Sequence, residues 1–284
     1  FGGQYANFRH VTYDPFSFSG KLDALKEATG KRALPTYNFK NADVIVSLNA
    51  DFLADWMGLN VSADYAGRRV PGKDMSRHIQ FETNMTNTGG SADKRYRIRP
   101  SEMGAALAML HNEIAGGSLN AGDTSLAKEI KSAAAELKKA GSRGLLVTGS
   151  NDKDIEALTI AINKALGSTA VDYNKRSHLR KGDDRAMGQL IEDMNAGRVG
   201  AVLIHNLNPA YVLAGNSKFS EGLAKVETSV YFSEKNDETA RLSKFVCARH
   251  NYLESWGDAM PVDGEYSLQQ PTIQPLFNTR QIED

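Results

Sequence analysis

Short apolar runs rich in β-branched residues alternate along this chain with longer stretches of helical periodicity. Residues 43–48 (Asp-Val-Ile-Val-Ser-Leu) form the clearest expected strand, and residues 199–205 form the most hydrophobic one in the second half. Such alternation is typical of βαβ units, in which helices connect parallel strands. The pattern therefore predicts an α/β fold of two consecutive doubly wound, mostly parallel sheets with helices on both faces, followed by an extended C-terminal tail.

The expected elements follow the same periodicities. Strands are expected at residues 10–13, 43–48, 77–82, 95–99, 144–147, 170–173, 199–205 and 229–232. Helices are expected at residues 19–30, 51–57, 63–68, 100–114, 124–140, 152–166, 184–196, 217–225 and 237–242.

Domain boundaries are suggested by breaks in this periodicity. Residues 115–123 contain three glycines and no apolar repeat, so we expect a first domain at 1–117 and a second at 118–284. Prolines mark residues 250–284 as an extended tail. Its apolar side chains need cover from another domain or subunit, or from their own domain. They are Trp256, Tyr266, Leu276 and Phe277.

Composition excludes several classes of protein. Lys plus Arg equals Asp plus Glu at 34 each, so no net charge attracts nucleic acid or anionic lipid. No apolar run approaches the roughly 20 residues that span a bilayer. The opening Phe-Gly-Gly-Gln has neither an initiator methionine nor a signal pattern, so we expect a fragment of a larger protein.

Cysteine and histidine offer little metal chemistry. The single cysteine, Cys247, excludes an intrachain disulfide and an iron–sulfur cluster held wholly by this segment, because such clusters take about four thiolates. Its apolar run, 245–248, predicts a small buried side chain. The six histidines show no metal-ligand spacing and are interpreted as surface or capping residues. His205, at a strand end, is the exception and is a candidate for lining a cleft.

Polar loops that follow the expected strands hold the candidate site residues. These loops lead towards helix N-termini, whose free N–H groups suit a phosphate or carboxylate. Ordinary capping by the same side chains is the competing interpretation. Nucleotide-binding glycine motifs, catalytic serine elbows and metalloprotease motifs do not occur in the sequence. The candidates are Asn49, Asp51, Thr86, Asn151, His205, Asn208 and Asp237.

Several segments, taken in order, resemble the molybdopterin oxidoreductase superfamily. Residues 41–52 are similar to its first strand and nucleotide loop. Residues 79–100 are similar to its series of a strand, an Asp-Pro-Arg loop, a Thr-x-x-Ala-Asp segment and an Ile-Arg-Pro segment. Asn208-Pro209, residues 237–240 (Asp-Glu-Thr-Ala) and residues 253–257 (Leu-Glu-Ser-Trp-Gly) continue the order. The shared order extends over roughly residues 10–270, although each short motif alone is weak.

Other sequence segments resemble one branch of that superfamily, the large iron–sulfur subunit of bacterial alternative complex III. The segments are Tyr13-Asp14-Pro15, residues 50–53, residues 254–259 and residues 270–280. This resemblance implies an exported, periplasm-facing subunit of a quinol:acceptor oxidoreductase, located at the bacterial inner membrane. It also implies that a cysteine-rich domain elsewhere in a longer parent chain carries the iron–sulfur clusters.

Departures from the superfamily pattern affect its nucleotide loops. Leu48 stands where the pattern has glycine, which permits positive φ and close backbone approach. Residues 82–84 (Glu-Thr-Asn) replace Asp-Pro-Arg, and residues 100–103 (Pro-Ser-Glu-Met) replace Pro-Gly-Thr-Asp. No residue can be placed as the molybdenum ligand. The resemblance therefore implies no cofactor in this segment, which belongs to a subunit of an oxidoreductase complex but is not expected to be catalytic by itself.

Three functions remain open at this point. The first is a non-catalytic scaffold that contacts other domains and subunits of a membrane-bound respiratory complex, without nucleic acid and without inserting into the membrane. The second is the cofactor-binding portion of a true molybdopterin-guanine-dinucleotide oxidoreductase whose metal ligand lies elsewhere. The third is an unrelated Rossmann-type nucleotide enzyme.

Overall fold

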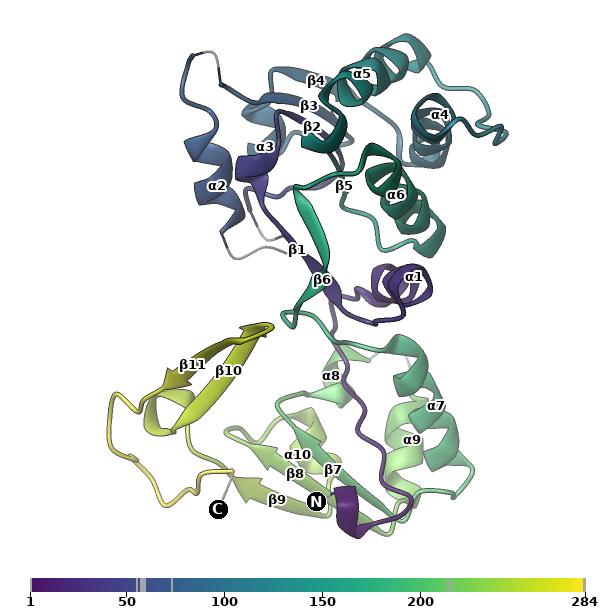
Figure 1. Cartoon of the computed structure of the whole chain (residues 1–284). Coiled ribbons are helices and arrows are strands. Elements are labelled where there is room, and N and C mark those ends of the chain that lie inside the picture. Colours follow the sequence, from purple (N-terminus) through teal and green to yellow (C-terminus); the bar gives the residue numbers. More distant parts are fainter. Residues whose placement is uncertain are drawn as a thin grey trace. The chain divides into compact units, whose positions relative to one another are not determined.

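The chain folds into two compact units, of which one is inserted into the sequence of the other (Figure 1). This computed structural model describes residues 2–54, 56, 60–72, 74–213, 215 and 217–282. The inserted unit is Phe18–Lys181, and the split unit combines Phe1–Ser17 with Gly182–Asp284.

The inserted unit contains a four-stranded parallel sheet in the order β4-β3-β2-β5. Two further strands, β1 and β6, form a separate antiparallel ladder. The strands are β1 (Leu34–Tyr37), β2 (Val44–Leu48), β3 (Arg77–Glu82), β4 (Lys94–Arg97), β5 (Gly144–Thr148) and β6 (Val171–Ser177). The helices are α1 (Ser19–Thr29), α2 (Val61–Gly67), α3 (Asn87–Gly90), α4 (Met103–Ala115), α5 (Ala127–Ala140) and α6 (Lys153–Leu166).

Both faces of this sheet are covered. Leu48 and Phe81 pack with residues of α4, α5 and α6 on one face, whereas Ile45 and Leu145 pack with residues that include those of α2 on the other. Figure 1 shows α2 on one side of the strands and the three longer helices on the other. Parallel strands buried on two faces are continuously apolar, which explains why the sequence of residues 43–48 predicted a strand so clearly.

The expected domain boundary at 117/118 does not coincide with the two units. It falls inside the inserted unit, between α4 and α5, which pack against each other. Beyond it, β5 pairs in parallel with β2, from Val44 opposite Gly144 to Leu48 opposite Thr148. Residues on both sides of the glycine-rich segment therefore build one sheet. The glycines form a loop between two packed helices rather than an interdomain linker.

The split unit contains a three-stranded parallel sheet in the order β7-β8-β9 and an antiparallel hairpin, β10–β11. Its strands are β7 (Ala201–His205), β8 (Thr228–Ser233), β9 (Phe245–Ala248), β10 (Gly257–Val262) and β11 (Glu265–Gln269). Its helices are α7 (Asp184–Asn195), α8 (Pro209–Val212), α9 (Lys218–Lys225) and α10 (Glu238–Leu242). The α/β class with parallel sheets flanked by helices, expected from the sequence, is confirmed.

Helices cover one face of the β7-β8-β9 sheet. Val202, Ile204 and Tyr231 are buried against residues of α7, α9 and α10. Exposure alternates along β7, with Ala201, Leu203 and His205 exposed on the other face.

The expected tail, 250–284, is partly a hairpin rather than wholly extended. The turn around Gly264, at φ 79°, joins β10 to β11. Later in the tail, Arg280 N donates to the carbonyl oxygen of Ala248 at 3.2 Å, so this part of the tail lies beside β9. The tail side chains expected to be exposed are exposed, among them Trp256 at 54% and Phe277 at 78%.

Some local expectations were wrong. Residues 10–13 form no strand, although Val11 and Tyr13 pack on the core of the split unit. In the expected helix 51–57, residues 51–54 form a turn, whereas 55 and 57 lie outside the described residues. Cys247 is exposed, because β9 lies at the edge of its sheet and is exposed along its length. His78 is fully buried rather than superficial, because it lies in the middle of the inserted unit's sheet.

In the described part of the chain, no helix is both long enough and apolar enough to cross a bilayer.

Candidate functional site

The carboxyl edges of the two parallel sheets are where an open α/β fold usually binds ligands. In the inserted unit this edge is formed by the loops after β2, β3 and β5. Four of the predicted site residues, Asn49, Asp51, Thr86 and Asn151, belong to this unit. The other three, His205, Asn208 and Asp237, belong to the split unit.

Asn49 joins the loops after β2 and β3. Its backbone N–H donates to the carbonyl oxygen of Phe81 at 2.8 Å, and its Oδ1 accepts from the N–H of Thr83 at 2.8 Å. Its φ is 55°, a left-handed conformation that asparagine tolerates better than most residues. The left-handed turn thus falls at Asn49 rather than at Leu48.

Leu48 does not obstruct the edge in the way its replacement of glycine suggested. Its side chain is 1% exposed and packs in the core with Leu107 and Leu137. Close backbone approach is instead made by Gly149, where an added Cβ would lie 2.0 Å from the carbonyl oxygen of Asn49. The compactness of this edge therefore comes from loop packing and not from the side chain of Leu48.

Asp51 and Thr86 hold the segment after β3. Asp51 Oδ1 accepts from Thr88 Oγ1 at 2.5 Å and from the N–H of Thr88 at 3.3 Å. Thr86 is the N-cap of α3, where its Oγ1 accepts from the N–H of Gly89 at 3.0 Å. Both predicted residues therefore act as intramolecular caps of short turns.

Glu82, the last residue of β3, is the centre of this edge although it was not among the predicted residues. Its Oε2 accepts from Thr86 Oγ1 at 2.7 Å and from Gln80 Nε2 at 3.3 Å. Its Oε1 accepts from the N–H of Thr86 at 3.3 Å and also pairs with Arg95 Nε. Burial raises the pKa of the Glu82 carboxyl, but the hydrogen bonds from Arg95 and Thr86 outweigh it and hold the pKa below its usual range.

Asn151 caps α1 rather than its own helix. Its Oδ1 accepts from the N–H groups of Gly20 at 3.0 Å and Lys21 at 3.4 Å.

The side chain of Lys21 forms a buried ion pair that was not predicted from the sequence. Lys21 Nζ pairs with Glu156 Oε2, both residues are 1% exposed, and Thr148 Oγ1 donates to the same carboxylate at 2.9 Å.

The edge of the split unit's sheet has a similar construction. Asn206, directly after β7, has a φ of 53°. Asn208 Oδ1 accepts from Thr239 Oγ1 at 2.6 Å, and its Nδ2 donates to Glu238 Oε2 at 2.8 Å. Thr239 in turn accepts from the N–H of Ala210 at 3.0 Å. The loops after β7 and β8 are thereby connected through Thr239, another residue not predicted from the sequence.

Asp237 and His205 complete this second edge. Asp237 caps α10 by accepting from the N–H of Ala240 at 3.0 Å, and its Oδ2 accepts from the hydroxyl of Tyr231 at 2.8 Å. His205 is the last residue of β7 and its side chain is exposed. The structure thus brings Asn208 and Asp237 to adjacent loops, because Asn208 bonds to Thr239, two residues after Asp237.

Polar groups at both edges are largely used within the protein. Among the described residues, the buried side-chain polar atoms without a partner belong to Trp56, Arg68, His111 and Ser177, and none of these is a predicted site residue. The described residues also contain no cluster of three histidine, cysteine or acidic side chains able to hold a metal ion. The side chains of Asn49, Asp51, Thr86, Asn208 and Asp237 therefore already have hydrogen-bond partners within the protein.

Two solved structures share the fold of this chain. Acetylene hydratase from Pelobacter acetylenicus matches 94% of this chain and 48% of its own, with a TM-score of 0.63 and 12% identity. A chain of the formyltransferase/hydrolase complex from Methylorubrum extorquens, solved with methylofuran, matches 94% of this chain and 80% of its own, with a TM-score of 0.55 and 14% identity. The α/β fold with parallel sheets flanked by helices, expected from the sequence, is thus shared with both proteins.

Among characterised proteins, the chain is similar to the menaquinone reductase molybdopterin-binding-like subunit of Nitratidesulfovibrio vulgaris (strain Hildenborough). The two are 28% identical over 296 aligned positions, which cover 87% of this chain and 43% of that subunit. The chain thus spans less than half the length of this relative. No family model matches the sequence. This similarity confirms the resemblance that was inferred from the sequence motifs.

Proposed function

We propose that this chain is the molybdopterin oxidoreductase-like part of an iron–sulfur subunit in a respiratory quinol:acceptor oxidoreductase, where it acts as a non-catalytic scaffold. Its partners are other domains and subunits of a membrane-bound complex at the periplasmic face of the bacterial inner membrane. Iron–sulfur clusters elsewhere in the complex carry the electrons. Similarity to a respiratory subunit named as molybdopterin-binding-like supports this role.

The observation that carries the proposal is the environment of Glu82. The superfamily pattern that this chain resembles has Asp-Pro-Arg at this place. Here the carboxylate turns into the protein, where it pairs with Arg95 and accepts hydrogen bonds from Thr86 and Gln80. It also fills the space over Gly89, where an added Cβ would lie 1.9 Å from Glu82 Oε1. A carboxylate with this set of partners stabilises the edge of the sheet instead of binding a nucleotide.

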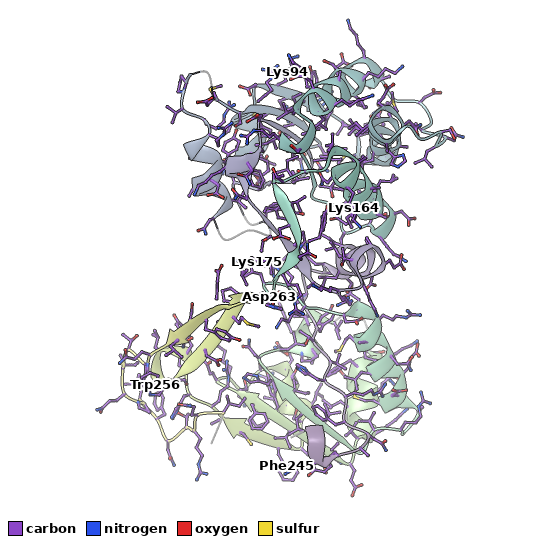
Figure 2. All side chains as sticks on the ribbon, in the orientation of Figure 1. Lys94, Lys164, Lys175, Phe245, Trp256 and Asp263 are labelled. Atoms are coloured by element: carbon purple, nitrogen blue, oxygen red, sulfur yellow. The ribbon has the colours of Figure 1, made fainter. Side chains whose placement is uncertain are left out.

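An uncovered apolar surface supports the docking role. Leu203, Val230 and Phe245 lie in register across β7, β8 and β9, and Leu203 and Phe245 are 49% and 59% exposed. Figure 2 shows Phe245 on β9 and Trp256 near the start of β10, both at the periphery of the split unit. Parallel sheets in α/β proteins are normally covered on both faces. Neighbouring domains or subunits provide this cover in the assembled complex.

Metal and nucleotide analysis tests the scaffold role. Purified chain should contain no stoichiometric molybdenum by plasma mass spectrometry, and guanosine diphosphate should not shift its melting temperature. Glu82→Asp is the variant to compare with the wild-type chain in both measurements. It provides the acid of the superfamily pattern and shortens the side chain that fills the edge. A stoichiometric pterin dinucleotide in the parent subunit, with contacts to Asn49 or Asp51, would refute the proposal and favour a true cofactor-binding domain.

A further inference from the structure

A basic pocket of about 270 Å³ lies in the inserted unit, away from the loops of the carboxyl edge. Its wall is made by the connection from α1 to β1 and by the end of β6 with the residues after it. Gly30, at φ 75°, ends α1 and turns the chain into this wall. The cationic or imidazole side chains that line the pocket are Lys31, Arg32, Arg176, His178, Arg180 and Lys181. Among the lining residues that the structure describes, none is acidic.

Two of the pocket's arginines are held in place by neighbouring groups. Arg32 Nε pairs with Asp23 Oδ1 at 2.7 Å, and its Nη2 donates to Ser19 Oγ at 3.3 Å. The Arg180 guanidinium lies 5.1 Å from the ring centroid of Phe18. Side chains fixed in this way lose less conformational entropy when they bind a ligand, and a guanidinium suits phosphate oxygens particularly well.

Ser177 supplies an observation that is independent of charge. It is the last residue of β6, lines the pocket and is 3% exposed. Its Oγ is buried and has no hydrogen-bond partner among the residues that the structure describes. A buried hydroxyl without a partner is unfavourable, and such groups are rare in folded proteins. A ligand oxygen in the pocket would satisfy it.

We infer that this pocket binds a phosphate-bearing anion, with the Ser177 hydroxyl donating a hydrogen bond and the surrounding Lys and Arg side chains compensating the charge. The register of the β1–β6 ladder explains the position of the pocket. Leu34 pairs with Ser177 and Pro35 with Arg176, and the register shifts directly after Pro35. This irregularity occurs at the end of the ladder where the basic residues gather. The inference is independent of the scaffold role, since neither Glu82 nor the sheet edge takes part.

Calorimetric titration of the full chain with sodium pyrophosphate at constant ionic strength tests the inference. Ser177→Ala should weaken binding about tenfold, through loss of a hydrogen bond to a charged group. It should not lower the melting temperature of the ligand-free protein, because the hydroxyl has no partner to lose. Arg176→Gln and Lys181→Gln, both at exposed positions, should also weaken binding.

Two controls separate a specific pocket from general charge or folding effects. The double variant Lys138→Gln/Lys139→Gln removes two exposed charges from α5 and should leave affinity within about twofold. Ser168→Ala removes a hydroxyl that already donates to the carbonyl oxygen of Gly144 at 2.6 Å. It should lower the melting temperature without changing the affinity for pyrophosphate.

A second titration distinguishes the source of the phosphate. Vesicles of phosphatidylglycerol that bind wild-type chain, but not Ser177→Ala, would assign the pocket to a lipid headgroup. Pyrophosphate binding without vesicle binding would assign it to a soluble phosphate compound. Absence of binding to both probes, or equal loss of binding in the Ser177→Ala and Lys138→Gln/Lys139→Gln proteins, would overturn the inference.

Discussion

His78 Nδ1 and the hydroxyl oxygen of Tyr65 lie 3.0 Å apart in the interior of the inserted unit. His78 Nε2 lies 3.1 Å from Gln80 Oε1 on the other side of the ring. Burial lowers the pKa of His78 to about 4, despite the opposing effect of the Gln80 hydrogen bond, so the imidazole is neutral at pH 7. Below about pH 6.5, unfolding is therefore accompanied by protonation of this residue.

This lowered pKa predicts a loss of stability in mild acid. Between pH 6.5 and 4 the unfolded chain binds a proton at His78 that the folded chain does not. The free energy of unfolding should therefore fall by about 3 kcal/mol as the pH falls through this range, and the contribution is fully present above pH 6.5. Urea denaturation at several pH values measures it. In His78→Asn this part of the pH dependence should disappear; an unchanged slope would show that other groups cause it.

Removal of Lys21 should destabilise the inserted unit strongly. Lys21 and Glu156 are both 1% exposed, and Lys21 Nζ also donates to the carbonyl oxygen of Thr148 at 3.2 Å. Lys21→Met leaves the buried carboxylate without its counter-ion, which should cost about 3–5 kcal/mol of unfolding free energy in chemical denaturation.

The double variant Lys21→Met/Glu156→Leu is the control for this pair. Because it removes both charges, it should recover much of the stability that Lys21→Met loses. If the double variant instead loses as much stability as the single variants Lys21→Met and Glu156→Leu combined, packing rather than charge explains the effect.

A methyl group at residue 149 should disturb the carboxyl edge of the sheet. The Cβ of Gly149→Ala would lie 2.0 Å from the Asn49 carbonyl oxygen, so one of the two loops must move. We expect a loss of about 1–3 kcal/mol in thermal or chemical unfolding.

Gly104→Ala provides a matched comparison. Residue 104 lies in α4, and an added Cβ would meet no described atom within 4 Å apart from its chain neighbours and the backbone of its own helix. This change should leave stability equal or raise it by up to about 1 kcal/mol, because alanine favours helices. Equal effects of the two substitutions would contradict the close approach at Gly149.

Cys247 provides a direct measure of whether the β7-β8-β9 sheet is covered. Because this cysteine is exposed on β9 and the sequence has no other, the isolated chain should react with Ellman's reagent without denaturant. In the proposed complex with neighbouring subunits, the same thiol should react much more slowly. Cys247→Ser corrects for background. Equal rates in the isolated and assembled chain would place the docking surface elsewhere.

Local pattern was sufficient for most elements of the fold. The apolar run before Leu48 predicted β2. The expected helix at residues 152–166 is α6, and Asp152 caps it, with its Oδ1 2.9 Å from the N–H of Asp154. These elements follow from residues close together in the sequence. The exposed aromatic residues of the tail could also be predicted, because its prolines and broken periodicity exclude a core of its own.

Relationships between distant residues could not be predicted in this way. Arg95 reaches Glu82 because β4 pairs with β3 in a register that places Arg95 opposite Gln80. Cys247 has an apolar neighbourhood in sequence but lies on an edge strand, and no local pattern indicates which strand is at the edge. For Asp51, Thr86 and Asp237 the capping hydrogen bonds are formed. Ligand binding by the predicted site residues stays a prediction.

The insertion of one unit into the other has a consequence for synthesis and for engineering. Asp183 N donates to the carbonyl oxygen of Thr12 at 2.8 Å, and Gly182 packs against Asp14, so the chain leaves and re-enters the split unit at neighbouring points. During synthesis, residues 18–181 are completed before residues 182–284, with which the first seventeen residues form a unit, have been made. A short glycine linker from residue 14 to residue 182 should therefore excise the middle of the protein and leave the outer portion able to close on itself.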